Sequence, residues 1–357
     1  MSNRNGGCIE YTPQKRLLFA AAKRLIQKGE LMNFKSIEKT FGKIAKIAYD
    51  LNEINREARS EPENLIGKAE CYYHAQIEEI AKDITVRGVK VINVAGGSSA
   101  GKTTSAKLIA KELEKHGKKS AVVSLDDFFL PRELTPKLPD GTYDFENFTA
   151  IDNVAYEKFL NTLIEKGAAD KPIFDFVVGK ALETEEIRLG ENDVIIIEGL
   201  HAMNPIFSEH LKAEKYNIYI SCEGNFFLGR NFLIPYKILR LMRRCLRDYY
   251  KRGSSLNETI NSWDAVSRGE DDYIIPFRPN ADFILDTTHV YEPLIFKYYL
   301  QPLIDVAEPV TEIEDFKNIF SRIGKLNKDL IPNSSFMWEF LVRNKIKRNS
   351  DIDLNNC

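Results

Sequence analysis

The residues whose spacing points most directly to chemistry lie between Gly96 and Thr104. The stretch GGSSAGKT from Gly96 to Thr103 satisfies the pattern GxxxxGK[ST] in full. Glycines let the backbone turn tightly so that its N–H groups face phosphate oxygens, and a following helix adds its positive dipole end. Lys102 supplies a charge for the outer phosphates, and Thr103 offers a hydroxyl to Mg²⁺. We therefore expect a site for ATP or GTP at Gly96, Gly97, Ser98, Ser99, Ala100, Gly101, Lys102, Thr103 and Thr104.

Two acidic residues stand where apolar segments end. Asp126, with Asp127 beside it, follows SAVVSL, and Glu198 follows DVIII. Ligands of open α/β sheets lie beyond the carboxyl ends of the strands. Phosphoryl transfer needs Mg²⁺ and a base for the proton of the attacking hydroxyl. We expect Asp126 to be the base and a partner of the metal, and Thr103 and Glu198 to complete the metal site. A single Asp after a strand is more often a turn or cap residue, but two such acids in a chain with this motif favour the catalytic reading.

Basic residues gather within twelve positions, from Arg240 to Lys251. Spacings of three and four place most of them on one side of a helix. A solvated face is the ordinary explanation, and it suits Lys251. The functional reading is a lid that closes over the phosphates, excludes water and supplies cationic groups in the transition state. The catalytic residues expected from this reading, besides Asp126 and Lys102, are Arg240, Arg243, Arg244 and Arg247.

Strands and helices that alternate along the chain would position these residues. The alternation predicts an α/β protein of the P-loop type, with a parallel sheet flanked by helices. Ser255 and Glu258 form a capping-box pattern for one more helix. The strands are expected at 89–95, 120–125, 171–176, 193–200, 216–221 and 281–286. The main helices are expected at 103–116, 153–166, 236–251 and 292–305.

The chain divides into three parts by pattern. Residues 14–83 have apolar positions at helical spacing, with a break at 60–64, so we expect residues 1–86 to be a helical N-terminal region that packs or binds a partner. The P-loop domain is expected at 87–305. Residues 306–357 show no clear pattern and are expected to form a C-terminal extension that packs on this domain.

Composition limits the function classes. The 357 residues carry a net charge of −2, which gives no electrostatic sign of binding to nucleic acid or to a membrane surface. No apolar run reaches the roughly 18–20 residues that span a bilayer, and the N-terminus is polar. We expect a cytoplasmic protein whose partner is a small molecule. Self-association into a homo-oligomer is compatible with the sequence.

Six segments in order resemble landmarks of the uridine kinase and phosphoribulokinase family: GGSSAGKT, SLDDFF, YDFENFTAID, FDF, IIIEGLH and LRLMRRCLRDYYKRG. The resemblance covers about residues 88–305 and is strongest to the bacterial-type nucleoside kinase branch. The stretch IPNSSFMWEFL (331–341) extends it towards the C-terminus. It implies the P-loop fold and transfer of phosphate from ATP, with Mg²⁺, to a small acceptor.

The resemblance also implies roles by position. Asp126 matches the family's catalytic acid, Glu198 matches the acid that ends the Walker B strand, and the four arginines match the lid. Asp144 matches an acid that contacts ribose hydroxyls, and Asp175 lies in an acceptor-side motif. The substrate-binding residues expected on this basis are Asp144, Phe174, Asp175, Lys180 and Arg252.

Departures from the family pattern concentrate on the acceptor side. Typical members have Tyr where this chain has Phe174, a histidine near Gly179 and Lys180, and an arginine where Ser254 stands. Polar groups that bind a substrate also discriminate among substrates, so their loss leaves the acceptor open. His201, close after Glu198, is expected either to touch substrate or to be structural.

We therefore expect an ATP-dependent kinase that acts on a hydroxyl of a nucleoside such as uridine. A kinase of another sugar or polyol, and a regulatory nucleotide-binding module with weak catalysis, are the alternatives. A GTPase is expected to carry an Asn-Lys-x-Asp motif. The most similar stretch, Asn327 to Leu330, has Leu instead of Asp at the fourth position.

Overall fold

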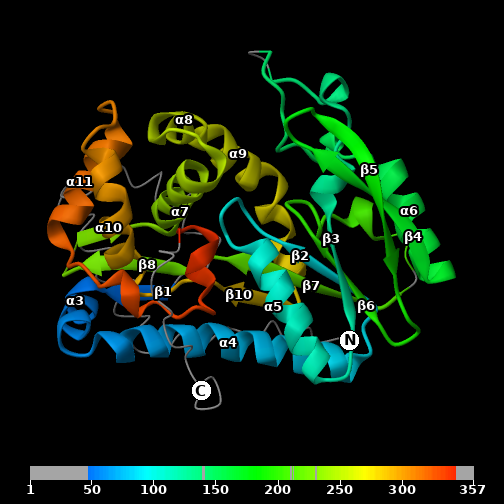
Figure 1. Cartoon of the computed structure of the whole chain (residues 1–357), viewed down its shortest axis with the longest axis horizontal. Helices are drawn as coiled ribbons and strands as arrows, with labels where there is room; N and C mark the ends of the chain where they lie inside the picture. Colours follow the sequence, from blue (N-terminus) through cyan, green and yellow to red (C-terminus); the bar gives the residue numbers. More distant parts are fainter. Residues whose placement is uncertain (1–46, 139–140, 210, 212, 230, 343–357) are drawn as a thin grey trace, which may run out of the picture. The chain divides into compact units, whose positions relative to one another are not determined.

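The computed structural model describes residues 47–138, 141–209, 211, 213–229 and 231–342 (Figure 1). Its internal contacts divide the chain into Met1–Ile47 and a compact unit from Ala48 to Cys357. Apart from Ile47, every described residue belongs to the second unit, which contains the whole GxxxxGK[ST] motif.

The main sheet of the described residues has five strands in the order β10-β7-β2-β6-β3, and every neighbouring pair is parallel. The strand that leads into the motif, β2, lies at the centre, and both β2 and β6 are buried along their whole length. Apolar strands buried on both faces are typical of parallel sheets. The strands are β2 (Val91–Ala95), β3 (Ser120–Ser124), β6 (Val194–Glu198), β7 (Lys215–Ser221) and β10 (Phe283–Asp286).

The sheet separates two hydrophobic cores. Ile92 and Val94 of β2 belong to one core, whereas Val91 and Ala95 belong to the other. This division follows from the strand period of two, which sends successive side chains to opposite faces. The first core contains α4, α5, α7, α10 and α11, and the second contains α6 and the β4–β5 hairpin. The fold is therefore the α/β P-loop architecture that the alternation of elements predicts.

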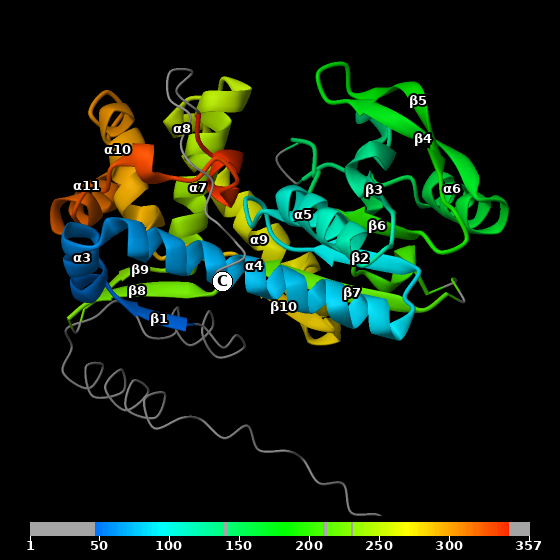
Figure 2. The same ribbon diagram turned by 60° about the horizontal axis from the view of Figure 1, so that its bottom comes forward.

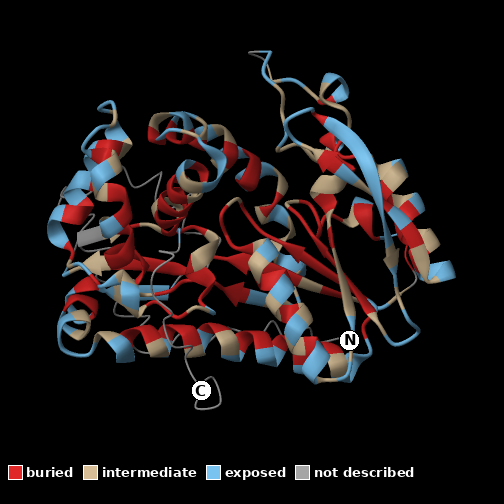
Figure 3. Ribbon diagram, in the orientation of Figure 1, coloured by how far each residue is buried: buried red, intermediate tan, exposed pale blue. Residues whose placement is uncertain are grey.

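The remaining elements surround this sheet (Figures 1 and 2). The helices are α3 (Leu51–Ser60), α4 (Pro62–Arg87), α5 (Lys102–Lys115), α6 (Asn153–Lys166), α7 (Tyr236–Arg252), α8 (Leu256–Asn261), α9 (Trp263–Tyr273), α10 (Glu292–Ile304) and α11 (Thr311–Arg322). A smaller sheet joins β1 (Ile47–Asp50), β8 (Gly224–Leu228) and β9 (Asn231–Ile234), and a hairpin pairs β4 (Ala168–Asp175) with β5 (Lys180–Arg188). Figure 3 shows that β5 is exposed along nearly all of its length.

The predicted strands and helices of the P-loop domain are confirmed with boundaries that shift by up to three residues. The capping box at Ser255 and Glu258 is present at the start of α8. The helical prediction for 14–83 holds for α3 and α4, but it is wrong at Ile47–Asp50, which form β1. Residues 14–46 lie outside the described part of the chain. Within the described residues, no helix is long and apolar enough to cross a membrane.

The helix α4 completes the outer edge of the main sheet through one side chain. The Gln76 amide donates to the carbonyl oxygen of Asp286 at 3.0 Å and accepts from the N–H of Asp286 at 2.9 Å. Asp286 is the last residue of β10, which has a strand neighbour on one side only. The Gln76 side chain thus takes the place of a neighbouring strand at this one position. It satisfies two backbone groups that would otherwise be buried without partners.

We predict that Gln76→Leu lowers the free energy of unfolding by about 2–4 kcal/mol, because two buried backbone groups lose their hydrogen bonds. Chemical denaturation measures this loss. The control is Gln301→Leu, since Gln301 bonds only to exposed Asp305, and we expect a change within about 0.5 kcal/mol. Equal effects of the two substitutions would contradict the ladder role of Gln76.

Candidate active site

The motif forms a tight loop between the central strand and α5. Two of its residues, Ser99 and Gly101, have left-handed backbone angles, with φ of 57° and 99°. Gly101 is also the N-cap of α5, and its lack of a side chain leaves the helix without a side-chain cap. The first N–H groups of a helix have no partner within the helix, so this uncapped end is suited to receive an anion.

Close packing against the loop explains why its first two positions are glycine. A Cβ atom on Gly96 would lie 2.2 Å from the carbonyl oxygen of Ile220. A Cβ atom on Gly97 would lie 2.2 Å from Nη2 of Arg240 and 2.6 Å from Oε1 of Glu270. Both distances are well below contact distance, so the lid helix and β7 press directly on the phosphate-binding loop.

Lys102 and Thr103 point towards the acidic residues at the strand ends. The Thr103 hydroxyl donates to Oε1 of Glu198 at 3.1 Å, and Nζ of Lys102 lies 3.3 Å from the Gly97 carbonyl oxygen. Burial lowers the pKa of Lys102, while the charges of Glu198 and Asp126 oppose this shift. The lysine is therefore held inside the site among carboxylates.

The sheet brings the two predicted acids together. Glu198 ends β6 opposite Ser124 of β3, and Asp126 lies in the short turn that follows β3. Burial raises the pKa of Asp126 to about 7, the charge of Glu198 adds to the rise, and Lys102 opposes it. A carboxyl group that exchanges its proton near neutral pH is suited to act as a base.

The neighbouring Asp127 has a different role. Its carboxylate pairs with Nζ of Lys171 on β4 at 2.5 Å, and it lies 3.4 Å from the backbone N of Phe174. The side chain of Lys171 is only 9% exposed. Asp127 therefore ties the hairpin to the sheet, which leaves Asp126 as the acid of this pair that remains in the site.

The first two lid arginines are embedded in the protein. Arg240 donates to the Ser98 carbonyl oxygen at 2.8 and 3.0 Å and pairs with Glu270 at 2.5 Å. Arg243 pairs with Glu292 at 2.7 Å through Nε. Both guanidinium groups are at most 2% exposed. Both arginines bond to a carbonyl oxygen of the loop and to a carboxylate, and Arg243 also donates to Thr287.

The other predicted basic residues lie closer to solvent. Arg244 donates to the Ser98 hydroxyl at 2.7 Å, and burial lowers its pKa. Arg247 bonds to Asp248 at 2.9 Å, and Arg252 lies 3.5 Å from the same carboxylate with its side chain 59% exposed. Burial lowers the pKa of Arg252, and the charges of Asp248 and Asp126 oppose this shift.

The predicted acceptor residues spread over several elements. Phe174 is buried against Phe129 and Phe176, with ring centroids 5.8 and 5.1 Å away. Asp175 accepts hydrogen bonds from two backbone N–H groups in the turn between β4 and β5, at 2.8 and 2.9 Å. Lys180 is exposed, and Asp144 is half-buried and bonds to the N–H of Glu146.

His201 is buried beside two aromatic rings. The rings of Phe148 and Tyr273 lie 6.4 and 6.3 Å from it. Burial lowers the pKa of His201 to about 4, so the ring is neutral at physiological pH. A neutral ring in this position cannot supply a positive charge to phosphates, although it can contact a substrate.

Two acidic residues of this region were not predicted from the sequence. Glu146 has its pKa raised by burial, while Arg244 and Lys102 oppose the rise. Glu270, which pairs with Arg240, lies in α9 without any motif around it. Glu146 stands two residues after Asp144 in the segment YDFENF, which is the one clue that could have identified it.

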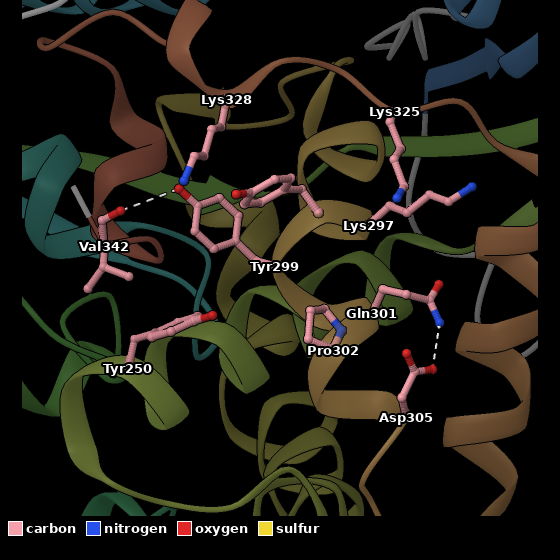
Figure 4. A pocket seen from close by; sticks show the side chains of 10 residues that line it. Tyr250, Lys297, Tyr299, Gln301, Pro302, Asp305, Lys325, Lys328 and Val342 are labelled. Atoms are coloured by element: carbon pink, nitrogen blue, oxygen red, sulfur yellow. Dashed lines mark hydrogen bonds between the residues drawn. The ribbon is translucent and has the colours of Figure 1, made fainter. Parts of the chain in front are cut away.

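A separate cavity lies on α10, with a volume of about 540 Å³ (Figure 4). Lys297, Lys325 and Lys328 line it together with Tyr299 and Val342. None of its lining residues belongs to the phosphate-binding loop or to the two strand ends. It is therefore distinct from the site described above.

We predict that Arg243→Met lowers the free energy of unfolding by about 3–5 kcal/mol, because it leaves the buried Glu292 carboxylate without its partner. The matched control on the same helix is Arg252→Met, because Arg252 is exposed and its 3.5 Å pair with Asp248 should contribute at most about 1 kcal/mol. Urea unfolding measures both. A loss below about 1 kcal/mol for Arg243→Met would contradict the buried role.

The chain is similar to known proteins over a little more than half of its length. A uridine-cytidine kinase B from Dictyostelium discoideum is 29% identical over 197 residues, which are 55% of this chain and 73% of that protein. A uridine kinase from Mycoplasma genitalium is 29% identical over 198 residues, 55% of this chain and 84% of that protein. A solved structure described as a possible uridine kinase from Bacillus stearothermophilus is 18% identical, with a TM-score of 0.40, and the match covers 59% of this chain and 98% of that chain.

The sequence profile of the phosphoribulokinase / uridine kinase family matches residues 91–292. This range begins with the strand before the phosphate-binding loop and ends at the start of α10. It therefore includes the loop, both strand-end acids and the whole lid helix. The chain belongs to the phosphoribulokinase / uridine kinase family and is a small-molecule kinase.

Proposed function

We propose that this chain transfers the γ-phosphate of ATP to a hydroxyl group of a small molecule, and that the acceptor is a nucleoside such as uridine. The observation that carries the proposal is the meeting of Asp126 and Glu198 at adjacent strand ends, beside Lys102 and Thr103. The names of the similar proteins, uridine kinase and uridine-cytidine kinase, favour a nucleoside acceptor.

The donor side of the proposal uses the loop and α5. The backbone N–H groups from Gly96 to Thr104 bind the phosphates, and Lys102 balances charge on the outer ones. Arg240 and Arg243 hold the carbonyl oxygens of Ser98 and Ser99, which fixes the shape of the loop. Arg244 and Arg247, which are less deeply embedded, are our candidates for contact with the transferring phosphate.

The residues near Thr103 fit a magnesium ion. Mg²⁺ prefers oxygen ligands and is usually held by one or two carboxylates together with phosphate oxygens and water. The Thr103 hydroxyl, Glu198 and Asp126 supply such oxygens. Burial, and after it the charge of Glu198, raises the pKa of Asp126, and a bound cation would favour the charged carboxylate. When bound, Mg²⁺ neutralises charge on the β- and γ-phosphates.

In the proposed reaction, the protein takes part in one proton transfer. The acceptor oxygen forms a bond to the γ-phosphorus, while the bond from that phosphorus to the β–γ bridging oxygen breaks and its electron pair leaves with ADP. The proton of the acceptor hydroxyl passes to Asp126. Burial favours this arrangement because water, the competing acceptor, is kept away from the phosphate.

The acceptor side is proposed to lie between the β4–β5 hairpin and the loop after β6. Asp144 and Arg252 would bind acceptor hydroxyls, with Lys180 at the exposed edge. Phe174 and His201 would supply apolar contact, and Asp175 would act by shaping the hairpin turn, since two N–H groups already occupy one of its oxygens. Typical family members have Tyr at the position of Phe174. Because Phe174 lacks that hydroxyl, a sugar or polyol acceptor remains the second candidate.

We also propose that the chain retains the three-part division at residues 86 and 305. The N-terminal part, 1–86, contributes α3 and α4, of which α4 packs on α5 and β10. The P-loop domain occupies 87–305. The extension, 306–357, contributes α11 and the segment that follows it.

We predict that Asp126→Asn lowers kcat by a factor of about 10²–10⁴, the usual contribution of a general base. Binding of Mg-ATP, measured by calorimetry, should change by less than about threefold, since loop contacts dominate binding. Asp170→Asn, on the exposed side of β4, is the matched control and should retain full turnover. Wild-type kcat in the Asp126 variant would overturn the assignment of the base.

An acceptor panel tests the nucleoside proposal. With Mg-ATP and equal concentrations of uridine, cytidine, adenosine, ribose and glycerate, we expect the pyrimidine nucleosides to give the highest kcat/KM. Coupled detection of ADP measures each rate. A tenfold preference for ribose or glycerate would reject the nucleoside and select the polyol alternative.

A further inference from the structure

The segment Ile331–Leu341, here called the C-terminal segment, reaches the phosphate-binding loop through one aromatic ring. A Cβ atom on Gly101 would lie 2.1 Å from Cε2 and 2.3 Å from Cζ of Phe336, and the third nearest atom belongs to the same ring. Gly101 is the N-cap of α5 and has a left-handed φ of 99°. Phe336 thus packs directly on the backbone at the point where the loop becomes a helix.

Two other side chains hold the loop residues just before Gly101. Nη1 of Arg243 donates to the carbonyl oxygen of Ser99 at 3.4 Å and to the hydroxyl of Thr287 at 3.0 Å. That hydroxyl donates in turn to the carbonyl oxygen of Ala100 at 2.8 Å. Ser99 has a left-handed φ of 57°, which costs energy for a residue with a side chain and persists only where the surroundings enforce it. Three successive loop residues are therefore held by side chains from distant parts of the chain.

The contacts of the Phe336 ring join it to this arrangement. Cζ of Arg243 lies 5.2 Å from the centre of the ring, a distance typical of a cation–π contact. The His289 ring stacks on Phe336 with centroids 5.3 Å apart and planes 6° from parallel. Phe336 is fully buried. The ring that touches Gly101 and the arginine that holds Ser99 are thus packed as one unit.

Hydrogen bonds on both sides of Phe336 anchor the C-terminal segment. The Ser335 hydroxyl donates to Glu70 on α4 at 2.6 Å. Nζ of Lys251 on α7 donates to the carbonyl oxygens of Trp338 and Glu339 at 2.7 Å. The segment is therefore tied to two helices, and its ring has a fixed place against the loop.

The N–H groups at the start of α5 take their direction from the backbone at Gly101. The first N–H groups of a helix have no partner within the helix, so they can bind an anion. Glycine has the least restricted backbone of all residues, so these groups would be loosely aimed if nothing packed on Gly101. A fixed ring at this position removes other backbone conformations before the nucleotide arrives. Binding then costs less conformational entropy.

We propose that Phe336 is a positioning residue of the donor site, whose ring packs on Gly101 and holds the N–H groups at the start of α5 towards the phosphates of ATP. This inference rests on the proposed function, because it requires ATP as the donor. It assigns the C-terminal segment to the nucleotide site, beyond the range 91–292 that the family profile matches.

Calorimetric binding of Mg-ATP to the full chain tests the proposal. We expect Phe336→Leu to raise the Kd about tenfold, because the loop must then be ordered when the nucleotide binds. The matched control is Phe340→Leu. Phe340 is also fully buried in the C-terminal segment and lies 5.1 Å from Cζ of Arg243, but it is not among the atoms nearest to the Cβ position of Gly101.

The control separates positioning from general loss of packing. Phe340→Leu should lower the melting temperature to a similar extent as Phe336→Leu, yet keep the Kd for Mg-ATP within about twofold of wild type. Circular dichroism checks that each variant is folded at the temperature of the binding experiment. If a Leu variant does not fold, Phe336→Met and Phe340→Met replace the pair with the same expectation, because Met fills a similar volume without a flat ring. Equal increases in Kd for the two positions would overturn the proposal.

The outcomes distinguish this inference from the proposed function. If the wild-type chain fails to bind Mg-ATP, the proposed function is wrong. If the wild-type chain binds Mg-ATP and the Phe336 variants bind it equally well, only the positioning role of Phe336 is wrong.

Discussion

The buried guanidinium group of Arg243 is the contact on which the rest of the site depends. It comes from α7 and bonds to Glu292 at the start of α10, to the carbonyl oxygen of Thr287 after β10, and to the Ser99 carbonyl oxygen of the loop. The guanidinium carbon of Arg243, Cζ, also lies 5.2 Å from the centre of the Phe336 ring. A buried arginine is stable only when its donors are satisfied, so each of these segments must keep its place for the others to fold. Residues distant in the sequence thereby hold the phosphate-binding loop in place.

The part of the site that the sequence predicts is the part with local constraints. The loop from Gly96 to Thr104 needs a fixed spacing of glycines and lysine, which a pattern can contain. Asp126 and Glu198 could be predicted to lie near each other because parallel strands end at the same edge of a sheet. In the structure, Ser124 of β3 lies opposite Glu198 of β6, and Asp126 follows two residues later. The sequence could not show why Asp126 rather than Asp127 stays in the site, because that depends on Lys171 of the hairpin.

The parts that the sequence did not predict depend on long-range packing. Glu270 and Phe336 reach the loop from far along the chain, and neither stands in a local pattern that announces the contact. The strand at Ile47–Asp50 lies in a stretch of sequence with helical periodicity, and its pairing with β8 overrides that local preference. The strand Lys180–Arg188 has polar residues on both faces, so no apolar alternation marks it. Its stability comes from pairing with β4.

We propose that this site moves phosphate to an acceptor and keeps it from water. If the half-buried Lys102 and Asp126 and the arginines of α7 serve this transfer, transfer to the acceptor must be much faster than hydrolysis. The most direct measurement follows the label from [γ-³²P]ATP in the wild-type chain, with and without uridine. The account predicts that the label appears in the nucleoside monophosphate and that release of inorganic phosphate without uridine is at least about a hundredfold slower. Equal release of inorganic phosphate with and without uridine, and no labelled nucleotide product, would contradict it.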